Sequence, residues 1–497
     1  MHSPYEGVTQ QTIEDIAKST EGILAGTGIQ GIDLSGLVAL VPVNVPARNN
    51  TSAFPRTVAG MGSKVAQWKA LLNINSEQAD VATGFDYAGK LAKIKEQEVF
   101  APYKPMASGG RVTLDAVAIN RNYADVLAVD QLQTLNQLFI GQDIHLINSQ
   151  NWELGKTSTP TLTVAKVAGK GKLKKSKKYK VCCVPKSGAN YFYGGQGIKS
   201  TEEEIEATDA SEESAITAKV KALKGAVAYD WYFGEEGKEL WYYTTTTVAE
   251  ATFYEVLTKA NALPSLPLLS TKEPSKHPTT EDKSSSANWY NGVIASILGN
   301  YGTESLVAPT SGTESGSVFI DNEGKELEAS GSSVKVLDEL FEQIWNSVQL
   351  SPTALMMNTQ QGESLSKLLL EGSIATTFLP PTEADARTNL AGGGFIGRYI
   401  NKAVGGVAVP IEVHPHLAPG TIIARTDRVP YPGSNIGSVF EVACQYDTMQ
   451  FDYAASRGSG EGEGPRYDFE IRSMETLKCH APNAQGIISN VKINANV

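Results

Sequence analysis

The sequence predicts an α+β protein, because helical and strand-rich patterns occupy different stretches of the chain. Apolar residues recur every three or four positions through residues 122–150, with Gln142 as a polar exception, and this predicts a long helix. Residues 407–413 and 421–424 are apolar runs of the β type, and the prolines and glycine between them favour a reversal of direction. Residues 158–260 contain short β-type runs separated by turn signals, which is typical of an antiparallel sandwich.

Length and composition set further limits. A chain of 497 residues with 41% hydrophobic and 20% charged residues is long enough for roughly two to four folded domains. No apolar run reaches the roughly 18 residues that a membrane helix needs, and the N-terminus lacks the features of a signal peptide. The net charge of −11 argues against sequence-independent nucleic-acid binding, although a container for packed DNA is compatible with this sign.

The N-terminal region predicts an arm followed by a hairpin. Residues 8–19 fit a short helix, and residues 24–50 read as an extended segment that either adds a strand to a neighbouring subunit or forms an ordinary edge strand. Residues 57–73 and 96–120 predict two strands of an extended hairpin. A hairpin of this kind is marginal alone, so it requires another surface to lie on.

The stretch 158–260 reads as an inserted domain. Tyr229, Trp231 and Phe233 alternate with Asp230 and Tyr232, so one aromatic face is expected to be core. The strand at this position resembles those of immunoglobulin-like or fibronectin-III-like modules.

Two charge runs, one basic (170–180) and one acidic (202–213), flank the first strands of this insert. They are expected to be solvated loops or strand edges, with an exposed decoration that touches a partner or a host surface as the alternative. Residues 261–288 are rich in proline and serine and read as a linker.

Later elements include a helix capped by Ser333 and a second helix at 363–371. Residues 456–464 read as a mobile or bulged Gly/Glu loop between two strands.

No constellation points to catalysis or to a metal. His414 and His416 are the closest histidine pair, but Glu412 is the nearest carboxylate and no Cys/His cluster completes a site, so they are expected at a turn or in the core. Asp427 and Arg428 are expected to take part in an intramolecular or intersubunit salt bridge rather than in catalysis.

Two further patterns are expected to be inert. The glycines at 392, 394 and 397 fit Gly-x-Gly-x-x-Gly only formally, because no buried strand precedes them. The four cysteines are expected to be buried free thiols.

Ordered segments in the C-terminal half carry a family resemblance. Residues 351–358 read Ser-Pro-Thr-Ala-Leu-Met-Met-Asn, and residues 407–415 read Val-Ala-Val-Pro-Ile-Glu-Val-His-Pro. Pro-Gly-Thr-Ile, Thr-Asp-Arg-Val-Pro-Tyr-Pro and, at 484–491, Ala-Gln-Gly-Ile-Ile-Ser-Asn-Val follow. In this order the segments resemble the major capsid proteins of tailed bacteriophages, the HK97-like class. The resemblance covers roughly 8–151 and 289–491, and the insert departs from it.

The resemblance implies an HK97-like fold with a β-sandwich insertion. The expected parts are an N-terminal arm (1–56), an E-loop hairpin (57–121), the spine helix of the peripheral domain (122–157), the sandwich insert (158–260), a linker (261–288), an axial domain (289–431) and C-terminal strands of the peripheral domain (432–497).

The resemblance also implies a mechanical function. The chain would self-assemble through hexamers and pentamers into the icosahedral head shell of a tailed phage and enclose double-stranded DNA without binding it specifically. We expect a separate scaffolding protein, a portal and possibly a decoration protein as partners, with assembly in the bacterial cytoplasm and a final place in the virion. No enzymatic activity, catalytic residue, cofactor, metal or membrane contact is expected. Some relatives crosslink Lys to Asn, but nothing at Lys90 or Lys93 predicts this here.

Two rival hypotheses remain at this point. The first is another phage structural protein, such as a tail tube, decoration or adhesin-type protein with an immunoglobulin-like module. The second is an α+β enzyme, which the lack of a paired nucleophile and base disfavours.

Overall fold

The computed structural model of the chain contains both helices and strands, with most strands in antiparallel or mixed sheets, as the α+β prediction requires. The contacts divide the chain into two compact units. Unit 1 comprises Met1–Ala66, Pro102–Asp143 and Val442–Thr476, and unit 2 comprises Gln67–Ala101, Ile144–Glu441 and Leu477–Val497. The structure describes residues 54–58, 64–72, 95–120, 125–167, 169–188, 195–207, 214–257, 280–301, 306–309, 316–330, 333–371, 396–429, 437–457 and 465–493. The predicted helix at 8–19, the extended arm at 24–50 and most of the linker lie outside these residues.

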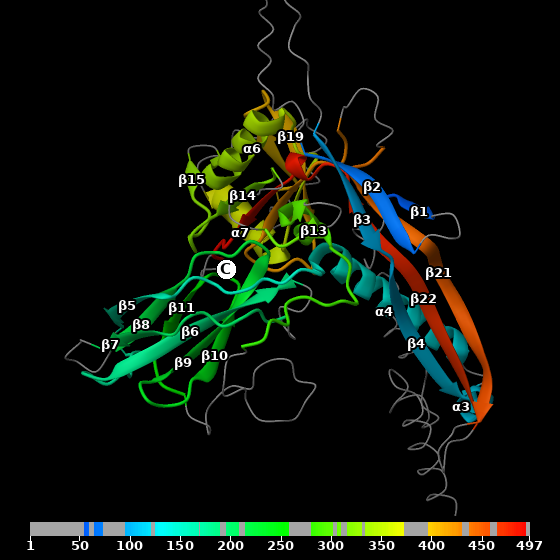
Figure 1. Cartoon of the computed structure of the whole chain (residues 1–497), viewed down its shortest axis with the longest axis horizontal. Helices are drawn as coiled ribbons and strands as arrows, with labels where there is room; N and C mark the ends of the chain where they lie inside the picture. Colours follow the sequence, from blue (N-terminus) through cyan, green and yellow to red (C-terminus); the bar gives the residue numbers. More distant parts are fainter. Residues whose placement is uncertain are drawn as a thin grey trace, which may run out of the picture. The chain divides into compact units, whose positions relative to one another are not determined.

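Unit 1 is built on two long strands with a helix against them (Figure 1). The sheet has the order β1-β21-β22-β4, in which β1 is parallel to β21 and β4 is antiparallel to β22. Leu138 packs on Phe469 and Ile471, so helix α4 covers the face of the sheet to which these side chains point. The bounds are β1 Arg56–Val58, β4 Lys104–Thr113, α3 Leu114–Asn120, α4 Val126–Asn148, β21 Phe440–Arg457 and β22 Pro465–Cys479.

The long helix predicted at 122–150 is confirmed as α4. Gln142, the polar exception in its apolar row, is buried and donates from Nε2 to Ser473 Oγ at 2.6 Å. The strand predicted through residue 120 is wrong beyond Thr113. The Thr113 hydroxyl accepts a hydrogen bond from the Ala116 backbone N–H, which starts helix α3 in place of a continued strand.

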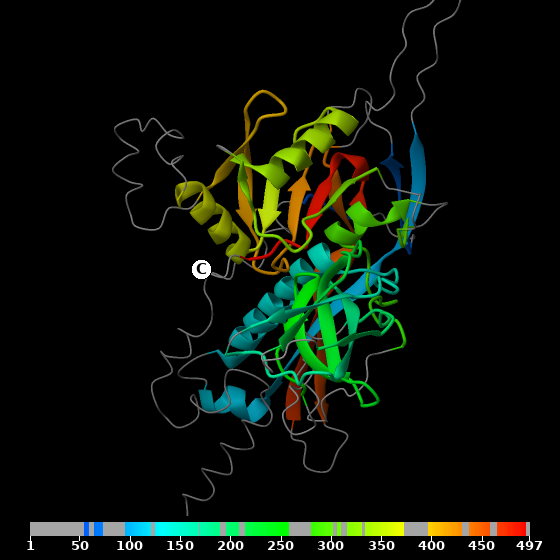
Figure 2. The same ribbon diagram turned by 90° about the vertical axis from the view of Figure 1, so that its left-hand side faces the viewer.

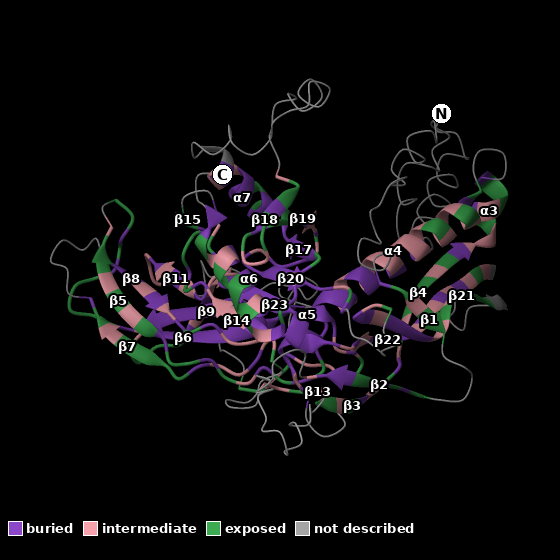
Figure 3. Ribbon diagram, turned by 90° about the horizontal axis from the view of Figure 1, so that it is seen from above, coloured by how far each residue is buried: buried purple, intermediate pink, exposed green. Residues whose placement is uncertain are grey.

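Unit 2 contains a six-stranded sheet with the order β14-β23-β20-β17-β19-β18. Strand β17 pairs parallel with β19 and antiparallel with β20, so the reversal predicted between 413 and 421 is confirmed, with β17 inserted between the two runs. The central strands β17, β20 and β23 are buried along their whole length (Figure 3). The bounds are β14 Val318–Asp321, β17 Ala354–Met357, β18 Arg398–Asn401, β19 Val407–Val413, β20 Ile422–Arg425 and β23 Gly486–Ser489.

Helices α5 (Val293–Leu298), α6 (Lys335–Val348) and α7 (Thr359–Glu371) belong to the same unit, and α6 and α7 lie beside the sheet (yellow-green and yellow in Figure 2). The helix predicted at 363–371 is confirmed as part of α7. The predicted cap of α6 is wrong, because Val334 is the N-cap residue and makes no side-chain cap. Ser333 instead donates from its hydroxyl to the Asp338 carboxylate.

The closing strand β23 pairs with β14 and β20, and not with the long strands β21 and β22. Residues Leu477–Val497 accordingly belong to unit 2. This corrects the expectation that 432–497 forms one set of C-terminal strands in the peripheral domain. The sequence showed an apolar run there, but the run contains no information about which sheet it joins. The predicted loop 456–464 lies outside the described residues from 458 onward.

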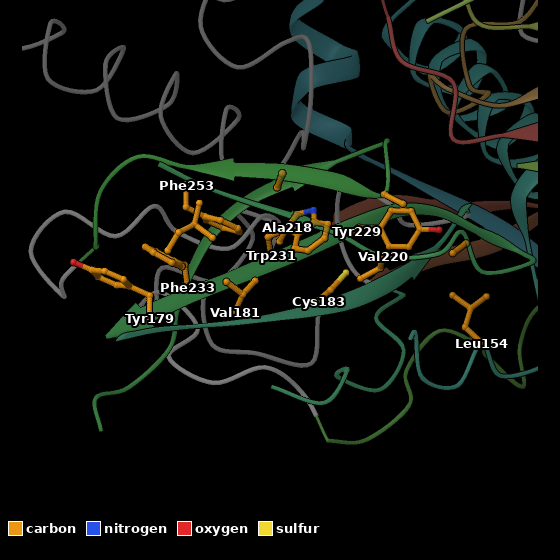
Figure 4. Close-up of a cluster of buried hydrophobic side chains, with 14 of the residues drawn as sticks. Leu154, Tyr179, Val181, Cys183, Ala218, Val220, Tyr229, Trp231, Phe233 and Phe253 are labelled. Atoms are coloured by element: carbon orange, nitrogen blue, oxygen red, sulfur yellow. The ribbon is translucent and has the colours of Figure 1, made fainter. Parts of the chain in front are cut away.

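The insert is a sandwich of two sheets, with the orders β10-β9-β6-β7 and β11-β8-β5. Trp231, Phe233 and Phe253 lie between them, with the rings of Phe233 and Phe253 stacked at 4.6 Å (Figure 4). The predicted aromatic core is therefore confirmed, while the immunoglobulin or fibronectin type stays a prediction. The bounds are β5 Thr161–Lys166, β6 Lys178–Ser187, β7 Glu203–Glu206, β8 Ser214–Lys219, β9 Ala226–Glu235, β10 Trp241–Thr246 and β11 Glu250–Phe253.

The insert is fixed to the rest of unit 2 by packing and by hydrogen bonds. Trp152 and Ala295, which lie outside the sandwich strands, belong to the same hydrophobic cluster as the insert core. Asn490 Oδ1 accepts from the Ala249 backbone N–H at 2.7 Å, and Asp321 Oδ2 accepts from Ala222 at 3.2 Å. The insert thus shares its hydrophobic core with residues of unit 2 on both sides of it in the sequence.

Candidate functional site

The candidate site is a two-stranded hairpin, β2 (Val65–Leu71) with β3 (Glu96–Pro102). Hydrogen bonds join Lys69 to Glu96 and Gln67 to Glu98, so the strands run antiparallel. The predicted hairpin is present only between 65–71 and 96–102, and the rest of its predicted strands is a wrong assignment, because 56–58 pairs with β21 and 104–113 pairs with β22. Residues 73–94, which connect β2 and β3, lie outside the described residues.

One face of this hairpin is fastened to unit 2. The Trp68 side chain is buried against Ala70, Val99 and Tyr301, and its indole Nε1 donates to the Cys479 carbonyl at 3.0 Å. Alternate residues of β2 are exposed, which is the pattern of a strand buried on one side only. Tyr301 belongs to a second small hairpin, β12 (Asn300–Tyr301) with β13 (Leu306–Val307).

The first described strand, β1, is held in unit 1 by an arginine. Arg56 Nη2 lies 2.8 Å from Glu475 Oε2 and 2.9 Å from Asp447 Oδ1. Burial is the largest single influence on the Arg56 guanidinium and lowers its pKa, but the charge and hydrogen bond of Glu475, together with the charges of Cys444 and Asp447, outweigh it, so the net shift is upward. Phe54, just before β1, is buried. The chain that continues from the predicted N-terminal arm is therefore anchored where it joins the sheet.

Asp427 and Arg428, the charged pair that the sequence singles out, lie beside a network of ion pairs centred on Arg425. Asp427 pairs with Arg425 at 2.7 Å, so the expected salt bridge is intramolecular for Asp427, while Arg428 is exposed. Arg425 also pairs with Glu412 at 3.0 Å, and its side chain is buried. The sequence did not identify Arg425, which lies in an apolar run and gives no separate signal.

His414 is buried at the turn after β19, as expected, and its ring lies 5.7 Å from that of His416. Within the described ranges, no group of three or more His, Cys, Asp or Glu side chains is arranged to hold a metal ion. Of the glycines in the formal Gly-x-Gly-x-x-Gly pattern, Gly392 and Gly394 lie outside the described residues.

All four cysteines are buried free thiols, as predicted. Burial raises the pKa of Cys182 and that of Cys479 to about 12, and these thiols therefore stay protonated at neutral pH.

The basic run of the insert is paired with acidic residues from other strands. Lys172 lies 2.9 Å from Glu255, and Lys177 lies 2.8 Å from Glu235. Lys180, on β6, lies 2.8 Å from Glu204 on β7. These contacts favour a solvated, internally neutralised surface over a uniform basic patch.

The insert contains a buried ion pair that the sequence analysis does not predict. Lys186 Nζ lies 3.2 Å from Asp230 Oδ2, and each side chain is 1% exposed. Gln196 Nε2 donates to the same carboxylate at 2.5 Å, and Thr245 also donates to it. In the sequence, Asp230 appears only as a residue that alternates with aromatic side chains.

No helix among the described residues is long and apolar enough to cross a membrane. No protein-family model matches this chain, and no curated protein matches it.

Solved structures with some similarity to this chain are capsids and an encapsulin. The capsid of a native GTA particle has a TM-score of 0.40 at 6% identity and covers 90% of this chain and 92% of that one. The cyanophage A-1(L) capsid has a TM-score of 0.39 at 9% identity, with 87% and 90% covered. The holo-SrpI encapsulin of Synechococcus elongatus PCC 7942 has a TM-score of 0.36 at 8% identity, with 90% and 89% covered.

Proposed function

We propose that this chain is a major capsid protein of the HK97-like class, which tiles the icosahedral head shell of a tailed phage around its double-stranded DNA. The observation that carries the proposal is the order of elements along one chain. A hairpin on a fastened base comes first, and a long helix packed on long strands follows. A six-stranded sheet with two helices lies toward the C-terminus.

The hairpin supports a role in contacts between copies. A two-stranded ribbon buries too little to be stable in water by itself, and this one is stabilised at its base by Trp68. The exposed face of β2 and β3 would pack on a second subunit. Because each subunit both gives and receives such a contact, many individually weak contacts sum to a stable shell.

Exposed apolar side chains on strands also support a role in contacts between copies. Val58 is 63% exposed, Met449 is 49% exposed and Val407 is 45% exposed. Single exposed apolar residues are ordinary, but these lie on regular strands, where another chain can pack against them. We infer that subunit contacts cover them in the shell.

The finer parts of the proposal concern partners. Hexamers and pentamers of this chain would form the shell, and a separate scaffolding protein, a portal and possibly a decoration protein would complete it. The chain would act mechanically and not as an enzyme, and it would reside in the virion after assembly in the bacterial cytoplasm. The net charge of −11 suits an inner wall that does not adhere to packaged DNA.

Sedimentation of the full chain, expressed alone and with a candidate scaffold, tests this proposal. We expect large, uniform particles from the wild type and their loss in Trp68→Ala, which removes the anchor of the hairpin. Lys69→Ala, an exposed neighbour on the same strand, serves as the matched control and should assemble normally. Only small species from the wild type under every condition would refute the proposal.

A further inference from the structure

One carboxyl group in the helix–sheet layer of unit 1 lies where a carboxylate is poorly accommodated. Asp130 is on α4, and its Oδ2 atom is buried without a hydrogen-bond partner among the described residues. The site is crowded, because a Cβ atom added to Gly110 would lie 2.6 Å from this oxygen and 2.2 Å from Phe469 Cζ. The missing side chain of Gly110 is therefore what allows α4 to approach β4 so closely.

We propose that Asp130 is a proton-sensitive contact, at which binding of one proton tightens the packing of α4 on β4 and β22. A buried carboxylate oxygen without a partner is costly, whereas a protonated carboxyl is neutral and carries its own donor. The inference concerns unit 1 by itself, and it holds whether or not the chain forms shells.

The charged groups around Asp130 are engaged elsewhere. Arg111, on β4, directs its guanidinium to Asp468 at 2.9 Å, and Arg466 donates to the same carboxylate at 3.0 Å. Met106 on β4 and Phe469 and Ile471 on β22, which share an apolar cluster with α4, carry no charge. Farther along β22, Glu475 is paired with Arg56.

The other acidic groups on neighbouring helices are separate from this site. Asp125 caps the start of α4 by accepting from the Ala128 backbone N–H at 3.1 Å. Asp115 is exposed on α3, and Asp143 lies 13 residues along α4, roughly 20 Å away at the rise of a helix.

The titration of Asp130 agrees with this geometry. Burial raises the pKa of its carboxyl from 3.8 to about 6, and a backbone hydrogen bond with Arg111 offsets only part of this shift. A raised acid pKa means that the charged form is disfavoured in the folded state. The penalty is absent below about pH 4, grows between pH 4 and pH 6, and is complete above pH 6. Acidification over that range therefore strengthens the layer.

Hydrogen–deuterium exchange of α4 in the purified full chain tests the proposal locally. Each variant is compared with the wild type at the same pH, so that the intrinsic exchange rates cancel. Asp130→Asn should slow exchange in residues 126–143 by about tenfold at pH 7.5, which is the effect of about one pKa unit once solvent screening at a half-buried group is allowed for. The difference should vanish toward pH 4.

Two further variants make the result decisive. Asp115→Asn removes an exposed carboxyl from unit 1 and should change nothing in α4 at either pH. Asp130→Ala removes the charge without adding an amide, and it should reproduce the dependence on pH even if the amide packs poorly. If the Asn and Ala variants differ from the wild type by a factor that does not change with pH, or if both exchange faster at pH 7.5, the proposal is wrong.

Discussion

Arg56 Nη2 lies 2.8 Å from Glu475 Oε2, and this ion pair joins the first described strand to a carboxylate with no exposed side-chain surface. Gln142 Nε2 lies 3.5 Å from the same oxygen, so helix, edge strand and central strand meet at one buried charge. Arg56 and Glu475 are 419 positions apart in the chain. The contact between Arg56 and Glu475 therefore links β1, which follows the predicted N-terminal arm, to β22.

Loss of this arginine should be costly. Arg56→Ala removes the cation that pairs with the buried Glu475 carboxylate, and we expect a loss of about 3–5 kcal/mol in the free energy of unfolding. Urea denaturation measures the change. Arg111→Ala is the control, because Arg111 is 51% exposed and its pair with Asp468 should contribute only about 0–1 kcal/mol. Similar losses in the two variants would contradict this assignment.

The ion pair inside the insert should behave as a unit. Lys186→Met leaves Asp230 charged and buried, so we expect a loss of about 3–5 kcal/mol. Adding Asp230→Asn removes the carboxylate that has lost its lysine partner, and should recover much of the lost free energy of unfolding. Trp231, which lies in the core between the sheets, reports unfolding by its fluorescence. A double variant as unstable as the sum of two single variants would show that the pair is not coupled.

Residue His145 should destabilise unit 2 in acid. Burial lowers the pKa of its imidazole to about 4, below the ordinary value of 6.5. The unfolded chain therefore binds a proton between pH 6.5 and pH 4 while the folded chain does not, and stability falls by at most about 3 kcal/mol across that window. His145→Phe keeps a ring beside Trp289, whose centroid lies 5.9 Å away, and should flatten this part of the profile. An unchanged profile from urea midpoints at each pH would refute the assignment.

The insert should be inseparable from the body of unit 2. Because Trp152 and Ala295 share its core, deletion of residues 158–260 should expose apolar surface and give an insoluble chain. Asn490→Ala removes the acceptor for Ala249 and a donor to Asp321, so we expect a loss of about 1–3 kcal/mol in thermal or urea unfolding. Asn288→Ala, at an exposed position, is the control. A soluble and folded deletion product would show that the insert is an independent appendage.

Local periodicity explains what could be predicted from the sequence. The spacing of apolar residues identified α4, and alternation on β9 identified Tyr229, Trp231 and Phe233 as core. The same alternation failed at residue 114, because Leu114 and Ala116 fit a strand face and a short helix equally well. In the structure, the Thr113 hydroxyl accepts a hydrogen bond from the Ala116 backbone N–H at the start of the helix.

Contacts between distant residues could not be predicted. Arg56 and Glu475, or Lys186 and Asp230, are ordinary charged residues in the sequence, and only the fold brings each pair together. The place of β23 depends in the same way on its partners β14 and β20. The residues of β23 alone do not indicate whether the strand joins the six-stranded sheet or the sheet of β21 and β22.

Electron microscopy of the purified full chain, alone and with a candidate scaffold, tests the central claim most directly. The capsid assignment predicts closed shells, or rings of five and six copies that close into shells when scaffold is added. Stacked rings or open tubes would contradict it and favour a tail protein. Small discrete particles under every condition would contradict any shell-forming role.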